Sequence, residues 1–472
     1  MDFTDTTRIK LFIGRKSLEE EGYTSMERDL TTGSVFRNVI LFSLPYLLSY
    51  FLQTLYGMAD LFIIGQFDSV AGITAVSIGS QVMHMLTVMI VGLAMGTTVS
   101  IAQAVGSKEH KKIAKCVGNT VILFMAVSIA LMALLLFFVH PIVQIMSTPA
   151  EAVDETVTYL TICFIGIPFI TAYNIISAIF RGMGDSKSPM YFIAVACVAN
   201  IAFDYLFIGF FDLGAAGAAL GTTVSQAISV VISLVVIIKK RSITLTKTDF
   251  KPDSQIMKKI VSIGIPIAFQ DGLIQISFLL ITIIANRRGL NDAAAVGIVE
   301  KIISFLFLVP SSMLSTVSAL GAQNIGAKKP ERARQTLWYA IAIAAGFGFV
   351  VAIVMQFVAE PVVSLFTDTN SSGGAEVIRL GGQYLQGYIW DCAFAGIHFS
   401  FSGYFCACQK SILSFVHNIV SISLVRVPGA YLMSTLFPAT LLPMGLATAA
   451  GSLVSVIICL VAFAWLKKKS DA

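Results

Sequence analysis

The chain has 472 residues, of which 56% are hydrophobic and only 12% are charged, whereas an ordinary soluble domain carries about a quarter charged residues. A soluble protein of this length needs more polar surface than this composition supplies, so the sequence indicates a membrane protein. The formal net charge of +5 could reflect a nucleic-acid or anionic-lipid partner, and the positions of the charges decide between these meanings.

The chain begins with a polar segment and continues as a series of long apolar runs. The first 34 residues lack the apolar core of a secretory signal, so we expect the first span to act as the signal itself. A membrane span needs about 20 apolar residues. Twelve such runs are predicted, at residues 36–66, 71–104, 114–139, 154–180, 189–211, 214–238, 258–285, 293–324, 333–358, 376–407, 411–436 and 441–466. The predicted fold class is therefore an all-α membrane protein with twelve transmembrane helices.

Basic residues are distributed unevenly among the connections. Most of the 32 Lys and Arg residues lie in the N-terminal segment, in every second connection and at the C-terminus, and the opposite connections carry only Arg287, Arg288 and Arg379. The positive-inside rule then places both termini in the cytoplasm of a bacterial-type plasma membrane. The net charge is explained by topology, so lipids are the expected surroundings and no nucleic-acid partner is expected.

The two halves of the chain resemble each other. The run "AQAVGSKEHKKIAK" after span 2 returns as "AQNIGAKKPERARQ" after span 8, and Pro45 returns as Pro266, an offset of about 220 residues. Six spans is an even number, so the halves should be related by a pseudo-twofold axis along the membrane normal. The expected organisation is a cytoplasmic tail, an N-lobe with spans 1–6, a linker, a C-lobe with spans 7–12 and a second tail, at residues 1–34, 35–239, 240–256, 257–466 and 467–472.

No enzymatic motif stands out on the chain. The seven cysteines are scattered within apolar segments without paired spacing and are interpreted as packing residues. No Ser/His/Asp order, zinc motif or nucleotide-binding motif is apparent. We therefore expect a protein that is not an enzyme and has no cofactor.

Carboxylates inside predicted spans are the first candidate functional groups. Each costs about 2.5–3.5 kcal/mol on insertion scales and is functional by default. Asp60 lies in span 1 and Asp204 in span 5, where Asn200 is four residues earlier and so shares its helical face.

Residue counting places these groups at one depth. Asp60 and Asp204 each precede an outer-loop aspartate by eight residues, and Thr222 follows the start of span 6 by eight. At about 1.5 Å per residue all three lie about 12 Å below the outer surface. Two carboxylates, one amide and one hydroxyl suit a hard monovalent cation or a proton, so Na⁺ is the expected metal if there is one. Mutual repulsion should make one carboxylate protonatable near neutral pH. The alternative is a static hydrogen-bond network that joins spans 1, 5 and 6.

The second half does not repeat this set. The residue at the offset from Asp60 is Leu280, and Arg426 lies opposite Asp204. The C-lobe instead carries a different polar group of residues: Asp271, Gln275, Glu300, Lys301, Asp391 and Arg426. These residues could form an anionic lining, partly neutralised by the two bases, that attracts a cationic substrate. Ion pairs that hold the C-lobe together are an equal alternative.

Several motifs together resemble the multidrug and toxic compound extrusion (MATE) family. They are "GMADLFIIGQF", "AQAVGSKE", "FRGMGDSKSPM", "NIAFDYLFI" and "AQNIGAKKPERA", in that order. The resemblance implies two six-helix lobes around a V-shaped cleft and export of organic cations driven by inward flow of Na⁺ or H⁺. In the archaeal and DinF-like branch the N-lobe cation site matches Asp60, Asn200, Asp204 and Thr222. NorM-like relatives use a span 7 glutamate in the C-lobe, where this chain has Ile274.

The predicted function is therefore an ion-coupled antiporter that exports small organic cations by alternating access, acting as a monomer. The alternative is a flippase of the same superfamily that moves a lipid-linked oligosaccharide or polysaccharide. Such flippases have a cationic interior, whereas acids outnumber bases within these spans. This balance favours a cationic substrate.

Overall fold

The structure is a computed structural model that describes residues 28–240, 245–367 and 373–471. The described residues form helices and connecting turns and contain no strand. The first half of the chain contains α2 (Val35–Phe67), α3 (Val70–Gly106), α4 (His110–Phe137), α5 (Val139–Ile145), η1 (Ala150–Ala152), α6 (Val153–Ile165), α7 (Ile167–Gly182), α8 (Lys187–Asp204), η2 (Tyr205–Phe210) and α9 (Gly214–Lys240). The second half contains α10 (Ser254–Asn286), α11 (Leu290–Leu306), α12 (Leu308–Gly326), α13 (Pro330–Ser364), α14 (Gly374–Tyr388), α15 (Trp390–Ala407), α16 (Ile412–Ser421), η3 (Ile422–Arg426), α17 (Val427–Leu436) and α18 (Leu442–Asp471).

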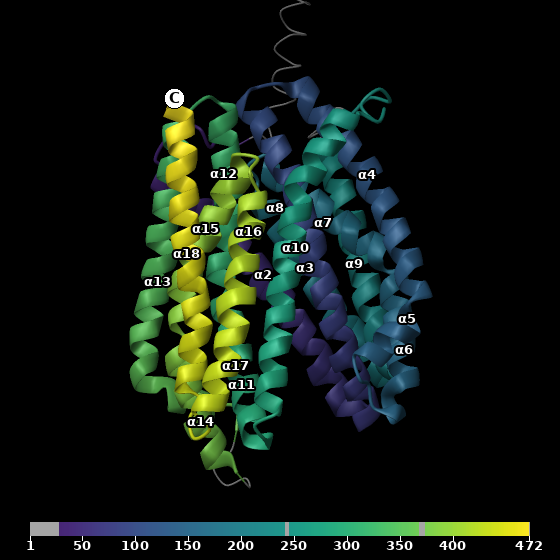
Figure 1. The fold of residues 1–472 in the computed structure, drawn as a ribbon. Coiled ribbons are helices and arrows are strands. Elements are labelled where there is room, and N and C mark those ends of the chain that lie inside the picture. The colour runs from purple at the N-terminus through teal and green to yellow at the C-terminus, as the bar shows by residue number, and fades with distance from the viewer. Residues whose placement is uncertain (1–27, 241–244, 368–372, 472) are drawn as a thin grey trace, which may run out of the picture.

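Each of the twelve predicted spans is a helix or a run of consecutive helices (Figure 1). Within the described residues, ten helical segments are long and apolar enough to cross a membrane, and the α6–α7 pair, bent by 46°, is an eleventh. The remaining predicted span, the tenth, is the α14–α15 pair, whose first helix carries charged and glycine residues. The predicted fold class, twelve helices in two lobes, is confirmed.

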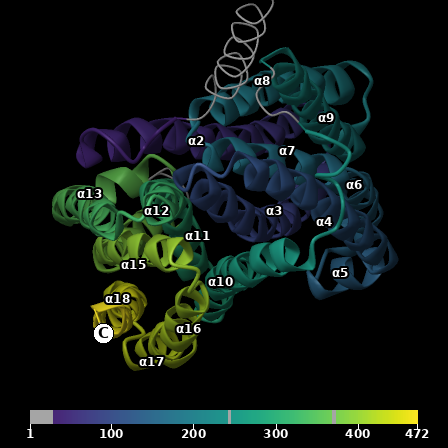
Figure 2. The same ribbon diagram turned by 90° about the horizontal axis from the view of Figure 1, so that it is seen from above.

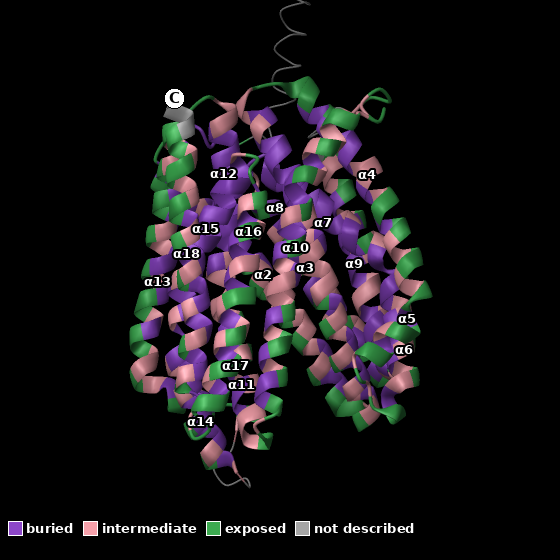
Figure 3. Cartoon of the chain, viewed as in Figure 1, coloured by how far each residue is buried: buried purple, intermediate pink, exposed green. Residues whose placement is uncertain are grey.

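The surface of these helices is apolar and part of the interior is polar. Large side chains such as Phe210 and Phe357 are 77% and 81% exposed, whereas Asp60, Asp204 and Asp391 are at most 2% exposed. Figure 3 shows the exposed residues along the outside of the bundle. Helices satisfy their own backbone polar groups, which lipid cannot do. This distribution is that of a protein surrounded by lipid.

The helices form two groups, and each group contacts the other through the equivalent helices of its half. Viewed from above, α3–α9 lie on one side and α11–α18 on the other, with α10 between them and α2 along one edge (Figure 2). Helix α10, the first of the second half, packs against α3, and α2, the first of the first half, packs against α12 as well as α8. The first span of each half therefore contacts the second span of the other half, as the internal repeat requires.

The repeated Gln-x-x-Gly motif forms the closest contact between the halves. A Cβ atom added to Gly106 would lie 1.9 Å from the carbonyl oxygen of Gln323, and one added to Gly326 would lie 2.2 Å from that of Gln103. The Gln103 side chain also donates to the Ala407 carbonyl (2.9 Å) and accepts from Lys259 Nζ (2.9 Å). The repeat is thus a reciprocal helix crossing at the end of the molecule that carries most of the basic loops.

Spans 5 and 11 share a local irregularity. Span 5 changes from α-helix to the π-helical turn η2 directly after Asp204, and span 11 contains the π-helical turn η3, which ends at Arg426. Such turns inside helices occur often at functional sites. The two turns lie in the fifth span of each half, but η2 follows Asp204 whereas η3 ends at Arg426.

The described helices extend beyond the expected lobe boundaries. Helix α10 begins at Ser254, inside the expected linker, and α18 continues to Asp471, inside the expected C-terminal tail. Residues 1–27 of the expected N-terminal tail and 241–244 of the linker lie outside the described residues.

Candidate functional site

Helices α2, α8 and α9 bring the four N-lobe candidates into one cluster. The Thr222 hydroxyl donates to Oδ2 of Asp60 (3.1 Å), and the Asn200 amide donates to the Thr222 hydroxyl oxygen (3.5 Å). The carboxyl groups of Asp60 and Asp204 are close enough to interact electrostatically. We call Asp60, Asn200, Asp204 and Thr222 the N-lobe cluster. The depth estimated from the sequence agrees with this contact.

The N-lobe cluster has more oxygen acceptors than donors. Oδ1 of Asp60, Oδ1 of Asn200 and both carboxylate oxygens of Asp204 are buried and receive no hydrogen bond from a described residue. Within the described part of the chain no Lys or Arg forms an ion pair with either acid. Buried acceptors without donors are costly, so a proton or a small cation between the two carboxyl groups is the simplest way to satisfy them.

A glycine that the sequence did not single out shapes this cluster. A Cβ atom on Gly221 would lie 2.2 Å from Oδ1 of Asp204. Glycine therefore lets α9 approach α8 closely enough for the neighbouring Thr222 to reach Asp60. The sequence feature that could have identified Gly221 is its position directly before the candidate residue Thr222.

The C-lobe candidates separate into a paired group and a free acid. Arg426 Nη1 lies 3.1 Å from Oδ2 of Asp391 in a buried ion pair, with side chains 8% and 0% exposed. Nη2 of Arg426 donates to the Tyr388 hydroxyl. The guanidinium carbon also lies 5.4 Å from the ring centre of Phe278. We call Phe278, Tyr388, Asp391 and Arg426 the C-lobe cluster.

Glu300 and Lys301 differ in their surroundings although they are adjacent. Glu300 accepts a hydrogen bond from the Thr282 hydroxyl (2.9 Å), and its other oxygen, Oε1, is buried without a donor. Lys301 is exposed, and within the described chain it makes no ion pair with Glu300. Lys301 therefore does not neutralise the C-lobe acids by direct contact.

Asp271 lies at the contact between the two halves. A Cβ atom on Gly92 of α3 would lie 3.0 Å from Oδ2 of Asp271 in α10, so the carboxylate faces the other half of the molecule. Its carboxylate accepts a hydrogen bond from the Gln270 amide (3.3 Å), and among the described residues no basic group pairs with it. Gln275, one turn further along α10, is partly buried. Asp271, like Glu300, thus has no basic partner among the described residues, and it faces the other half of the molecule.

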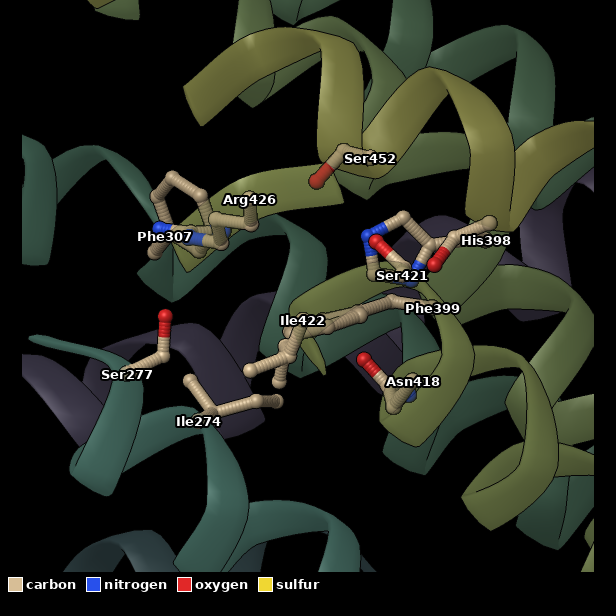
Figure 4. A pocket seen from close by; sticks show the side chains of 11 residues that line it. Ile274, Ser277, Phe307, His398, Phe399, Asn418, Ser421, Ile422, Arg426 and Ser452 are labelled. Carbon is tan, nitrogen blue, oxygen red and sulfur yellow. The ribbon is translucent and has the colours of Figure 1, made fainter. Parts of the chain in front are cut away.

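A small cavity lies beside the C-lobe cluster (Figure 4). Its lining includes Arg426, Ser277, Ser421, Ser452 and His398. The cavity has room for about one water molecule. Sequence reasoning missed this serine lining, because isolated serines in apolar spans give no periodic signal.

Long apolar helices around buried acids, in two halves related by a repeat, define a multi-pass membrane transporter. The chain belongs to the MatE family, whose model matches residues 45–206 and 266–432. The resemblance seen in the sequence is thereby confirmed at the level of the family.

Individual relatives agree with this membership. The chain is similar to the probable multidrug resistance protein YpnP of Bacillus subtilis (strain 168), with 28% identity over 86% of this chain and 90% of the relative. It is also similar to the multidrug export protein MepA of Staphylococcus aureus (strain MSSA476), with 24% identity over 86% and 89%. A solved structure described as an outward-facing multidrug resistance MATE family transporter has the same fold, with a TM-score of 0.84, 21% identity and coverage of 94% and 98%.

Proposed function

We propose that the protein is a multidrug efflux antiporter that exports small organic cations, driven by inward movement of H⁺ or Na⁺. The names of its relatives as multidrug resistance or export proteins support the exported class. The N-lobe cluster supports the coupling, because its pattern matches that of the DinF-like branch. The protein needs no cofactor other than the coupling ion.

One observation carries the proposal: two buried carboxyl groups meet without a base. Neither Asp60 nor Asp204 can be fully ionised at low cost while the other is charged. Entry of H⁺ or Na⁺ neutralises the pair and draws α2 and α8 together, and loss of the ion lets them separate. Since α2 also contacts α12 of the other half, a change in the N-lobe cluster reaches the contact between the lobes. That link couples the ion to alternating access.

Asp271 is the acid best placed to attract the exported cation. It faces α3 across the contact between the halves and has no basic partner among the described residues. Asp391, by contrast, is neutralised by Arg426, and Glu300 is engaged by Thr282. A cationic substrate entering between the lobes would therefore meet Asp271, with Gln275 one turn away as a hydrogen-bonding partner.

The same proposal includes the orientation of the chain in the plasma membrane. The reciprocal Gln-x-x-Gly crossing lies at the basic end of the molecule, which the positive-inside rule assigns to the cytoplasm. Both termini are then cytoplasmic, the protein is a monomer in the plasma membrane, and residues 35–239 and 257–466 are the two moving lobes.

Inverted membrane vesicles containing the protein test the coupling. Ethidium movement should respond to a Na⁺ gradient or to a pH gradient imposed separately, and Asp204→Asn should abolish that response at matched expression. Asp212→Asn is the control, because Asp212 is an exposed aspartate in the turn between η2 and α9. Its φ of 54° is one that asparagine also adopts, so the substitution should not strain the turn. Ion-driven ethidium movement at the wild-type rate in Asp204→Asn contradicts the coupling site.

The flippase alternative gives a different result in these vesicles. A protein that moves a lipid-linked saccharide would show no ethidium response to either gradient, in the wild type as well as in the variant. That outcome would remove the antiporter proposal as a whole, whereas an intact response in Asp204→Asn would remove only the N-lobe cluster.

A further inference from the structure

The internal repeat extends to the two polar clusters. The offset of about 220 residues relates Asp204 to Arg426. A slightly larger offset, of about 230 residues, relates the pair Gly221–Thr222 of α9 to Gly451–Ser452 of α18. The residues that build the N-lobe cluster on spans 5 and 6 thus have counterparts on spans 11 and 12.

In both lobes the counterpart residue lies at a π-helical turn and beside a glycine of the last span, although the turn follows Asp204 in the N-lobe and ends at Arg426 in the C-lobe. The π-helical turn η2 begins directly after Asp204, and η3 ends at Arg426. A Cβ atom on Gly221 would lie 2.2 Å from the Asp204 side chain, and one on Gly451 would lie 2.8 Å from Cβ of Arg426. In both lobes a glycine of the last span lets that helix approach the functional residue of the preceding span.

The chemical difference is that the C-lobe position holds a positive side chain. The Arg426 guanidinium is surrounded by groups that bind cations: Oδ2 of Asp391 at 3.1 Å, the Tyr388 hydroxyl and the face of Phe278 at 5.4 Å. Carboxylates pair with guanidinium through charge-assisted hydrogen bonds, and aromatic faces attract it. Every contact that a bound organic cation would make is made here by the chain itself.

We propose that the C-lobe contains a second cation-binding site, selective for guanidinium-type cations, and that the tethered Arg426 side chain occupies it permanently. The site takes no coupling ion, so the protein carries its coupling ion only in the N-lobe. This inference goes beyond the proposed function, because it depends on the repeat and the C-lobe contacts and does not require transport.

The unsatisfied atoms around Arg426 agree with a binding site adapted to more than this one side chain. Oδ1 of Asp391, Oε1 of Glu300 and Nε of Arg426 are buried without a hydrogen-bond partner in the described structure. Arg426 also lines the cavity formed with Ser277, Ser421 and Ser452 (Figure 4). If the ion pair served only to join helices, every guanidinium N–H group and carboxylate oxygen would be expected to have a hydrogen-bond partner. Removal of the arginine side chain would leave acceptors arranged around a space of guanidinium size.

Chemical rescue of purified Arg426→Ala protein tests the proposal. The melting temperature in detergent should fall relative to wild type, because Asp391 loses its partner. Guanidinium chloride at about 10 mM, far below denaturing concentrations, should raise it again by about 3–6 °C in a saturable manner. Tetramethylammonium chloride at equal concentration controls for ionic strength and should have no such effect.

Two further variants make the test specific. Arg181→Ala is a matched control, because Arg181 is also buried, 8% exposed, and stacks on the Tyr46 ring at 4.1 Å, but forms no ion pair with a described acid; guanidinium should not stabilise it. The double variant Asp391→Asn/Arg426→Ala removes the carboxylate as well and should lose the response.

Each result of these melting-temperature measurements either supports the guanidinium site or contradicts it. Saturable stabilisation confined to Arg426→Ala supports the site, and so does recovery of folded Arg426→Ala protein only when guanidinium is present during purification. No stabilisation, equal stabilisation of wild type, or failure to fold in both conditions overturns it. A failure of ethidium transport has no bearing on these readouts, so the two proposals are tested separately.

Discussion

Asp204 of the N-lobe cluster and Arg426 of the C-lobe cluster occupy corresponding positions of the repeat, but the two clusters differ in electrostatic character. In the N-lobe, Asp60 and Asp204 have no basic partner among the residues that the structure describes, and four of the cluster's oxygen atoms receive no hydrogen bond from them. In the C-lobe, Asp391 is paired with Arg426, and Tyr388 completes the contact. The same helical framework therefore supports a cluster whose acids have no basic partner among the described residues and a cluster whose acid is paired with an arginine of the chain.

Because of this difference we expect the two lobes to have different roles in transport. A pair of acids that binds and releases an ion can change the packing of its helices, because each state has a different charge. A pair that is neutralised within the chain keeps one arrangement. We expect the N-lobe to move during the transport cycle and the C-lobe core to remain rigid, and substitutions in each lobe should break different properties.

The largest expected effect on stability comes from Asp391→Asn. This change leaves Arg426 buried without its counter-charge, and breaking a buried pair in this way costs about 3–5 kcal/mol. The melting temperature of the purified protein in detergent should fall by several degrees. In Asp204→Asn it should stay unchanged or rise, because that substitution removes one of two repelling acids. A fall of equal size in both variants would show that the two clusters do not differ in the way described.

The second effect concerns the glycine of the N-lobe cluster. Gly221→Ala places a methyl group 2.2 Å from Oδ1 of Asp204, and overpacking of this kind costs about 1–3 kcal/mol. We expect weaker binding of the coupling ion, measured as a higher ion concentration for half-maximal ethidium transport. Gly65→Ala on α2 is the matched control, because nothing lies within 4 Å of its added Cβ. If both variants transport alike, close approach at Gly221 is not required.

The fold and the N-lobe cluster could be predicted because both depend on local spacing. Apolar runs of span length gave the twelve spans, and the four-residue spacing of Asn200 and Asp204 placed them on one face. Counting from the outer loops brought Asp60 and Thr222 to the same depth. All of these estimates use only helical rise and periodicity, which a membrane span obeys closely.

The C-lobe arrangement could not be predicted because it depends on helix rotation. Helices that are apolar on all sides give no moment to set which face points inward, so the sequence could not tell that Arg426 meets Asp391 while Lys301 faces outward. The breaks within spans 4, 8, 10 and 11 add to this difficulty. At Gly166, for example, α6 and α7 bend by 46°, and every later residue of the span changes direction with that bend.

A smaller effect is expected from the hydroxyl that bridges the N-lobe cluster. Thr222→Val removes the hydrogen bond to Asp60 at 3.1 Å while keeping the shape of the side chain. One such bond is worth about 1 kcal/mol, or about five-fold in affinity for the coupling ion. Ser452→Ala, at the corresponding C-lobe position, should leave the ion dependence of transport unchanged. A five-fold shift in Ser452→Ala instead would place a coupling ion in the C-lobe as well.

The smallest effect is expected from Lys301→Ala, which tests whether Lys301 contributes to the C-lobe cluster. Lys301 is adjacent to Glu300 in sequence but is exposed and makes no ion pair within the described residues. Exposed charges of this kind contribute about 0–1 kcal/mol, so the melting temperature and the ethidium profile should match wild type. A loss of stability close to that of Asp391→Asn would mean that Lys301 neutralises Glu300 despite its exposure. The C-lobe acids would then share two bases, and Arg426 alone would no longer explain why this lobe differs from the N-lobe.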